Sequence, residues 1–266
     1  MKRIISAIII LIIIIPILII GNNIYNTGVF ILSLLGLNEF INIKNEKKQV
    51  PLFIRTISYI TLSFLIFTNM NKLTTFTIDY RILSGIFILF LLPTIIYHDR
   101  KKYSINDAFY LMGGTMFLGI SFGLLIPIRN LGLNMMLYLL LISTIADTYA
   151  LITGKLIGKH KLTKEISPNK TIEGLIGGLI FGTFIPVMFY KTVINSNINI
   201  LKLTLITMFL CLLGQFGDLT FSAIKRYFGK KDFSKLIPEH GGILDRLDSI
   251  IFVLLGFMFF INIIGG

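Results

Sequence analysis

Long apolar stretches separated by short polar connections recur along the whole of this 266-residue chain. A helix of roughly 17–25 apolar residues is long enough to cross the hydrocarbon layer of a membrane. The pattern therefore predicts an all-α, polytopic integral membrane protein with about nine transmembrane helices. The expected spans are residues 4–20, 28–43, 53–70, 82–97, 107–127, 131–152, 172–190, 200–224 and 243–264.

The composition agrees with this pattern. Hydrophobic residues make up 55% of the chain and charged residues only 14%, and the mean hydropathy is +0.84. Such a chain is too apolar for a surface that faces water everywhere. The first stretch follows Met1-Lys2-Arg3 as a secretory signal would, but no small-x-small cleavage site comes after it. We therefore expect it to be retained as a helix.

The net charge of +12 is unevenly distributed between two alternating sets of connections. The set that includes the N-terminus contains Lys2, Arg3, Lys44, Lys47, Lys48, Arg100, Lys101, Lys102 and basic clusters at 155–170 and 225–246. The opposite set contains only Lys72, Arg81, Arg129, Lys191 and Lys202. Because Lys and Arg are enriched in cytoplasmic loops, we expect a cytoplasmic N-terminus and an outside C-terminus in the cell (inner) membrane. The basicity thus reports topology, and no nucleic-acid partner is expected.

Two of the predicted cytoplasmic connections, residues 154–174 and 225–249, combine several cations with glycines and prolines. Carboxylates lie at the ends of the apolar spans that flank them, where an unpaired carboxylate is costly and normally marks a partner, a pathway or a metal. Two of these carboxylates are three residues apart, which places them on one face of a helix. The four are Asp147, Asp218, Asp245 and Asp248.

Carboxylates beside lysines suit a site in which a divalent cation and a polyphosphate lie between them. Magnesium takes one or two carboxylates and completes its shell with phosphate oxygens and water. Lysines would neutralise the remaining phosphate charge, and glycines would let backbone N–H groups approach it. The alternative is that these acids and cations only neutralise one another at helix ends. GKLIGK at 154–159 is not a phosphate-binding P-loop, because its glycine spacing is one residue short and His160 stands where Ser or Thr belongs.

The segment PEHGG before the last span leaves two questions open. His240 could transfer a proton, since an unperturbed imidazole titrates near pH ~6.5, or it could make a phosphate or backbone contact. Gly241 and Gly242 could break the loop before the last span, and they would also permit close approach of a nucleotide. Glu39, within the second span, has no assigned role.

These polar residues form a recognisable motif. From Ser222 the chain reads SAIKRYFGKKDFSKLIPEHGGILDRLD, which resembles the signature of the phosphatidate cytidylyltransferases (CDP-diacylglycerol synthases). The blocks ADTYALITGKLIGKHKLTKEISPNKTIEGLIGG at 146–178 and GQFGDL at 214–219 resemble two other polar blocks of that family. The N-terminal half matches only in having several hydrophobic helices. We therefore divide the chain into N-terminal transmembrane helices, 1–105, and C-terminal helices with cytoplasmic-face catalytic loops, 106–266.

The resemblance implies a transfer of the cytidylyl group of CTP to phosphatidate at the bilayer surface, with release of pyrophosphate. It implies a magnesium ion, with or without a second cation, and a homodimer. By similarity, the metal ligands are Asp218 and Asp245. The catalytic residues are Asp218, Asp245, Asp248, Lys225, Arg226 and His240. The substrate-binding residues are Asp147, Lys155, Lys159, Ser167, Lys170, Thr171, Ser222, Lys231, Asp232, Gly241, Gly242 and Arg246.

Two other functions fit some of these features. A CDP-alcohol phosphotransferase also handles a nucleotide lipid in the membrane, but its Asp-Gly-x-x-Ala-Arg signature is absent from this sequence. A membrane transporter of an anionic, phosphorylated substrate would also use intramembrane acids and basic loops. Transporters usually place their sites near the bilayer midplane and often have repeated halves, and the sequence shows neither feature.

Overall fold

The computed structural model describes residues 12–45, 47–69, 80–97, 102–237 and 239–264. The start of the first predicted span lies outside these residues, and so do Lys2, Arg3, Lys72, Arg100, Lys101 and Pro238 of the sequence motif. Residues 12–20 of that span are helical. The cytoplasmic placement of the N-terminus stays a prediction.

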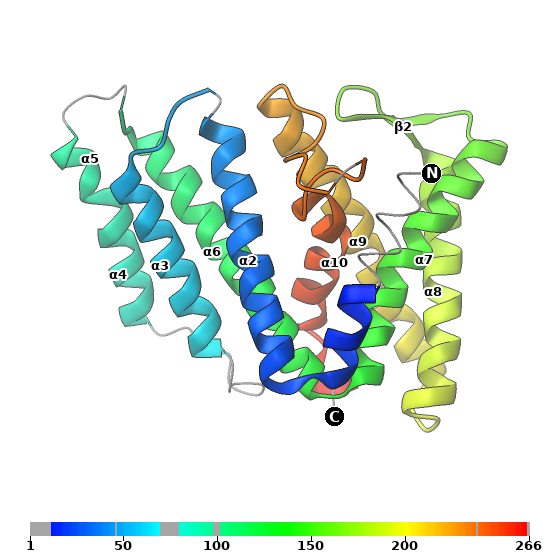
Figure 1. The fold of residues 1–266 in the computed structure, drawn as a ribbon. Coiled ribbons are helices and arrows are strands. Elements are labelled where there is room, and N and C mark those ends of the chain that lie inside the picture. Colours follow the sequence, from blue (N-terminus) through cyan, green and yellow to red (C-terminus); the bar gives the residue numbers. More distant parts are fainter. Residues whose placement is uncertain (1–11, 46, 70–79, 98–101, 238, 265–266) are drawn as a thin grey trace. The chain divides into compact units, whose positions relative to one another are not determined.

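The described chain is almost entirely helical, and each predicted span from the second onward coincides with helix (Figure 1). The prediction of an all-α, polytopic membrane protein is confirmed. Among the described residues, five helices are long and apolar enough to cross a membrane, and the count of about nine spans stays a prediction. The long helices are α2 (Asn22–Asn45), α6 (Ile105–Asn130), α7 (Leu133–Ile157), α8 (Ile172–Phe189), which continues into the π-helical turn η1 (Tyr190–Ile194), and α9 (Ile200–Tyr227). The others are α3 (Leu52–Asn69), α4 (Tyr80–Leu91), α5 (Pro93–Ile96), α10 (Leu244–Phe257) and α11 (Ile261–Ile264).

Two spans are interrupted where the sequence pattern indicated continuous helix. The span at 82–97 divides at Leu92, because Pro93 lacks an N–H and occupies the first turn of α5. The span at 243–264 divides into α10 and the short α11. Hydropathy alone does not detect such breaks, since the residues on both sides are equally apolar.

A small β-hairpin in the connection between α7 and α8 was not predicted. Strand β1 (Lys161–Thr163) pairs antiparallel with β2 (Ser167–Thr171), and Lys161 lies opposite Thr171. Strands this short, made mostly of lysine, threonine and other polar residues, show no alternation of apolar and polar positions from which a strand could be inferred.

The chain forms two compact units. The first contains residues 1–127 and 232–245, and the second contains 128–231 and 246–266. The connection after α9 therefore leaves the second unit, contributes residues 232–245 to the first, and returns within α10. These units are defined by contacts in space. The division predicted from the sequence, at residue 105, sets the C-terminal helices with the catalytic loops apart from the N-terminal helices, and it stays a prediction.

In the first unit, α2 contacts α6 through side chains. The Phe40 and Tyr110 rings stack with their centroids 4.6 Å apart, and the Tyr25 hydroxyl donates to the Leu125 carbonyl at 3.2 Å. Asp107, at the start of α6, accepts hydrogen bonds from the ammonium groups of Lys44 and Lys48. Both ends of the helix pair are thus fixed by polar contacts as well as by apolar packing.

In the second unit, small residues bring α7 and α8 almost into backbone contact. A Cβ added to Gly178 would lie 2.7 Å from the Ala146 carbonyl oxygen, and one on Gly174 would lie 2.7 Å from that of Ala150. Helices in membranes pack through such small-residue faces because lipid supplies no hydrophobic drive between them. This close packing sets the spacing of the polar residues at the adjoining ends of the two helices.

Candidate active site

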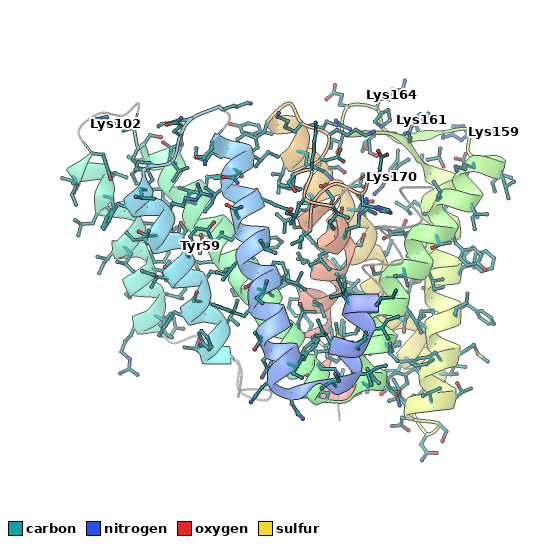
Figure 2. All side chains as sticks on the ribbon, viewed as in Figure 1. Tyr59, Lys102, Lys159, Lys161, Lys164 and Lys170 are labelled. Atoms are coloured by element: carbon teal, nitrogen blue, oxygen red, sulfur yellow. The ribbon has the colours of Figure 1, made fainter. Side chains whose placement is uncertain are left out.

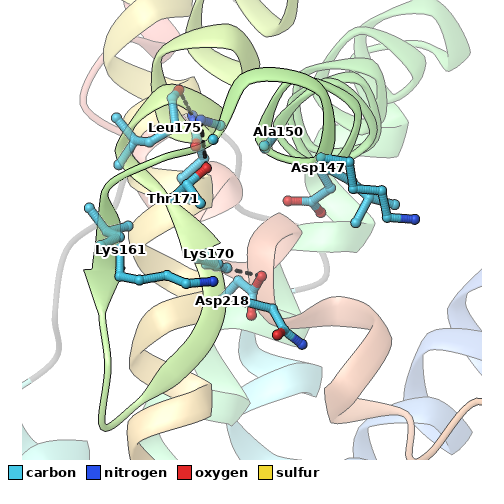
Figure 3. Close-up of a pocket in the computed structure, with 15 residues that line it drawn as sticks. Asp147, Ala150, Lys161, Lys170, Thr171, Leu175 and Asp218 are labelled. Atoms are coloured by element: carbon cyan, nitrogen blue, oxygen red, sulfur yellow. Dashed lines mark hydrogen bonds and ion pairs between the residues drawn. The ribbon is translucent and has the colours of Figure 1, made fainter.

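A pocket of about 580 Å³ opens in the second unit between α7, the β-hairpin, α8 and α9 (Figure 3). It is lined by acidic, basic and amide side chains together with backbone at glycines. The lining residues are Asp147, Ala150, Leu151, Gly154, Lys155, Gly158, Lys161, Leu162, Asn169, Lys170, Thr171, Gly174, Leu175, Gln215 and Asp218.

Two carboxylates line the pocket from different helices. Asp147 points into it from α7, and Asp218 from α9 (Figure 3). Asp218 Oδ2 forms an ion pair with Lys170 Nζ at 2.7 Å, and its Oδ1 accepts from the Ser222 hydroxyl at 3.3 Å. The side chains of Asp218 and Lys170 are each 28% exposed, so this ion pair can be reached from the pocket.

A third carboxylate, Asp248 on α10, is buried in the second unit, at 8% exposure. Asp218 and Asp147 repel it electrostatically, while the equally buried Lys225 of α9 attracts it. Asp147 and Asp218 also repel each other. Three like charges within electrostatic range of one another, with Lys170 and Lys225 beside them, make this part of the second unit favourable for a bound cation.

The basic side of the pocket comes from the end of α7 and from the hairpin. Lys155 belongs to the last turn of α7, and Lys161 and Lys170 reach the pocket from β1 and β2 (Figure 3). Lys159 and Lys164 lie at the same end of the unit, on the outer part of this connection (Figure 2). The hairpin therefore concentrates positive charge over one mouth of the pocket, as an anionic substrate requires.

Polar contacts at its base and tip hold the hairpin in place. Glu173, in the first turn of α8, accepts from the backbone N–H groups of Lys159 and His160, and its Oε1 lies 2.6 Å from His160 Nδ1. At the tip, Arg226 Nε donates to the Ile166 carbonyl at 3.2 Å, and Arg226 Nη1 donates to the Lys230 carbonyl at 3.1 Å. Arg226, predicted as a catalytic cation, thus fixes the hairpin to the end of α9.

Thr171 ends β2 and caps α8. Its Oγ1 accepts from the Gly174 N–H at 3.1 Å, as an N-cap threonine does. Glycine is needed around it, because a Cβ on Gly158 would lie 2.7 Å from that oxygen. The capped helix start, with its partial positive charge, belongs to the pocket lining through Thr171 and Gly174.

The donor set of this pocket fits a hard divalent cation. Asp147 and Asp218 supply carboxylate oxygens, and a magnesium ion bound by one or two carboxylates fills its other positions with water and phosphate oxygens. Among the described residues, no three His, Cys, Asp or Glu side chains converge as a ready-made metal cage. The pocket therefore suits an ion that arrives with phosphate better than an ion bound by protein alone.

The structure brings together many, but not all, of the predicted site residues. Asp147, Lys155, Lys170, Thr171 and Asp218 line the pocket. In the same unit, Ser222 donates to Asp218, Asp248 is repelled by both pocket carboxylates, and Lys225 attracts Asp248. The remaining predicted residues of this unit are away from the pocket lining: Lys159, Ser167, Arg226, Lys231 and Arg246.

The other predicted residues belong to the first unit, in the segment 232–245. Asp245 Oδ2 accepts from the backbone N–H groups of Phe233 at 2.9 Å and Gly242 at 2.8 Å. Asp245 and Asp248 share α10 three residues apart, as the spacing predicted. That Asp245 and Asp218 share one cation stays a prediction. Asp232 and His240 lie in this segment too, and the His240 N–H donates to the Ile237 carbonyl at 3.0 Å.

Sequence reasoning missed three polar residues that line the pocket: Lys161, Asn169 and Gln215. Lys161 and Asn169 lie on the hairpin, which was not predicted. Only the register of its two strands tells which of its side chains point into the pocket. Gln215 was part of the quoted GQFGDL block, and its position three residues before Asp218, on the same helix face, was a usable signal. Its Nε2 donates to the Leu175 carbonyl of α8 at 3.3 Å.

Comparison with known proteins gives one consistent result. Residues 1–264 match the family described as "Cytidylyltransferase family". Similar proteins named phosphatidate cytidylyltransferase occur in Staphylococcus haemolyticus, at 38% identity over 253 residues, and in Staphylococcus saprophyticus, at 36% over 253. The protein of that name in Staphylococcus aureus is 38% identical over 254 residues. Each alignment covers 95% of this chain and 95% of the relative.

Proposed function

This chain belongs to the cytidylyltransferase family, and from that membership we propose that it transfers the cytidylyl group of CTP to phosphatidate. The products are CDP-diacylglycerol and pyrophosphate, and the reaction belongs to phospholipid biosynthesis. The observation that supports this most directly is the pocket of the second unit, where Asp147 and Asp218 face the pocket together with Lys155, Lys161 and Lys170.

The reaction needs charge neutralisation more than proton transfer. An oxygen of the lipid phosphate attacks the α-phosphorus of CTP, and the bond from that phosphorus to the bridging oxygen of the β-phosphate breaks, so the electron pair leaves with pyrophosphate. The lipid phosphate is already an anion at neutral pH and needs no strong base. What opposes the reaction is repulsion between two anions and the charge that grows on the leaving group.

The lysines around the pocket answer that requirement. Lys155, Lys161 and Lys170 would hold phosphate oxygens, and the ion pair of Lys170 with Asp218 fixes one ammonium group before substrate arrives. A pre-positioned charge needs no reorganisation during the reaction. Gly154, Gly158 and Gly174 line the pocket beside the start of α8, where a phosphate chain would meet the partial positive charge of the helix.

Asp147 and Asp218 would hold the magnesium ion, with Asp248 close behind and Asp245 as the further predicted ligand. When bound, the ion would neutralise the oxygens of both phosphates, as metal ions do in phosphoryl and nucleotidyl transfer. The residues of this chain would orient it: Ser222 holds Asp218 through a hydrogen bond, and Lys225 offsets the charge of Asp248.

The substrates decide where this site must lie. CTP and pyrophosphate are water-soluble, while phosphatidate keeps its acyl chains in the bilayer, so the reacting atoms meet at the membrane surface. We place that surface on the cytoplasmic side of the inner membrane, following the distribution of lysine and arginine in the sequence. The expected homodimer remains a prediction from the family resemblance.

The deciding experiment is an assay of the purified protein with labelled CTP and phosphatidate in mixed micelles. We expect CDP-diacylglycerol and an equal amount of pyrophosphate, formed only when a divalent cation is present. Product formation that continues in excess chelator would overturn the cation requirement. No product under any condition, together with flux of a phosphorylated solute in liposomes, would favour the transporter, which the comparisons do not support.

A further inference from the structure

Glu39 is a buried carboxylate far from the pocket in sequence, and the reaction as described gives it no part. It lies on α2 at 3% exposure. Its Oε1 accepts from the Ser234 hydroxyl at 2.6 Å and from the Ile243 N–H at 2.9 Å, and its Oε2 accepts from the Leu244 N–H at 2.9 Å. All these donors are neutral and belong to the segment 232–245 of the same compact unit.

The two backbone donors stand at the start of α10. The first N–H groups of a helix have no partner within it, and they favour a negative charge nearby. Side chains that cap a helix usually come from the residue just before it. Here the cap is a glutamate 204 and 205 residues earlier in the chain, in a helix of the half with no chemical motif.

The two glycines of the motif, Gly241 and Gly242, lie directly against carboxylate oxygens. A Cβ on Gly242 would lie 2.5 Å from Glu39 Oε2, so a side chain at 242 would displace the carboxylate. Gly241 has a φ of +83°, and a Cβ there would lie 2.8 Å from Asp245 Oδ2. Both glycines therefore let a carboxylate approach the backbone, which is a reason for their presence that needs no nucleotide.

From these contacts we propose that Glu39 is a positioning residue: it anchors the start of α10 and thereby fixes where Asp245 stands in the active enzyme. The inference rests on the proposed cytidylyltransferase function. Asp245 is one residue beyond Leu244, and its Oδ2 is bonded to the N–H groups of Phe233 and Gly242. Release of Glu39 would thus loosen both the helix start and the loop that holds Asp245.

The first test is Glu39→Gln, which keeps the shape of the side chain but replaces one acceptor by an NH₂ group that faces an N–H donor. We expect kcat to fall about 10- to 100-fold, as for a small misplacement of a catalytic group, while KM for CTP changes less than about twofold, because the pocket in the second unit is untouched. Hydrogen exchange of the peptide containing residues 243–245 should become faster, a readout that does not depend on activity.

The matched control is Asp107→Asn. Asp107 is a buried carboxylate of the same unit that also bonds to α2, through Lys44, and to Lys48 in the turn after α2. We expect it to lower the thermal stability of the protein while kcat of the folded fraction and exchange at 243–245 stay near wild type. Equal effects of the two variants on kcat would mean that Glu39 acts only through general stability and would overturn the proposal.

A double-mutant cycle guards against simple misfolding of the Glu39 variants. Gly242→Ala should reduce kcat strongly when Glu39 is present, because the new methyl group meets its carboxylate. In a Glu39→Ala background the further loss from Gly242→Ala should be several-fold smaller. Additive losses would contradict the proposed contact. If the wild-type protein forms no CDP-diacylglycerol, the proposed function fails, whereas the exchange data still test the anchor by themselves.

Discussion

The two compact units use carboxylates in opposite ways: Asp107 and Glu39 of the first unit are buried, whereas Asp147 is exposed and Asp218 is partly exposed in the second. In the first unit, Asp107 is bonded to Lys44, Lys48 and Ser104, and Glu39 to Ser234 and two backbone N–H groups. In the second unit, Asp147 and Asp218 line a pocket and repel each other, and Asp218 is paired with the partly buried Lys170 and accepts from the Ser222 hydroxyl.

This difference distinguishes carboxylates that stabilise the fold from carboxylates that are available to a ligand. A carboxylate whose oxygens are already engaged by protein donors stabilises the fold and has little capacity for a ligand. Like charges that face a common pocket store repulsion that a bound cation relieves. On this ground we expect Asp147 and Asp218 to bind the ligand and Asp107 and Glu39 to stabilise the fold, although all four lie in apolar helices.

The largest expected effect is that of Asp218→Asn. Loss of this charge would weaken cation binding and release Lys170, so we expect kcat/KM to fall by about 10²–10³. Thermal unfolding in detergent should change little, because the Asp218 side chain is partly exposed, at 28%. Near-normal turnover in this variant would contradict the assignment of Asp218 as a ligand, and steady-state kinetics at several Mg²⁺ concentrations provide the measurement.

Asp107→Asn should have the largest effect on stability. It leaves Lys44 and Lys48 without their carboxylate, and we expect the free energy of unfolding to fall by about 3 kcal/mol, at the lower end for buried pairs because Lys48 reaches the surface. Thermal unfolding with and without CTP measures the loss. A variant as stable as wild type would show that the comparison between the two units is wrong for Asp107.

A smaller effect distinguishes two lysines of the same connection. Lys161→Ala removes a cation that lines the pocket, and we expect KM for CTP to rise about tenfold, as for one lost charge-assisted hydrogen bond. Lys159→Ala is the matched control, because Lys159 is exposed and is not part of the pocket lining, and its KM should stay within about twofold. Equal KM values would mean that the hairpin does not select which lysine meets the nucleotide.

The smallest effect is expected at the cap of α8. Thr171→Ala removes the acceptor of the Gly174 N–H and should cost about 1 kcal/mol of stability. Thr171→Ser keeps the oxygen and serves as the control, with unfolding close to wild type. A Thr171→Ala variant that unfolds at the wild-type temperature would show that the hairpin and Glu173 hold the start of α8 without the cap.

The helices, the family and part of the pocket could be predicted from the pattern of residues. Hydropathy located the helices because a segment that crosses lipid must satisfy its backbone internally and present apolar side chains outside. The polar motifs identified the family and five of the eight charged or polar side chains that line the pocket, since acids and lysines at the ends of apolar spans are too costly to occur without a use. The hairpin escaped detection because its pairing depends on register, which short polar strands do not encode.

Local sequence therefore determined which segments are helical and which side chains carry charge. It also indicated that these charges suit phosphate chemistry. Only the tertiary structure decided that Lys161 and Gln215 join the pocket, that Arg226 holds the hairpin, and that Glu39 caps a helix about 200 residues away in the chain. The reason is physical. Helix formation and hydration depend on neighbours along the chain, whereas the partner of a buried charge is the group that the packing of the chain brings within about 3 Å of it.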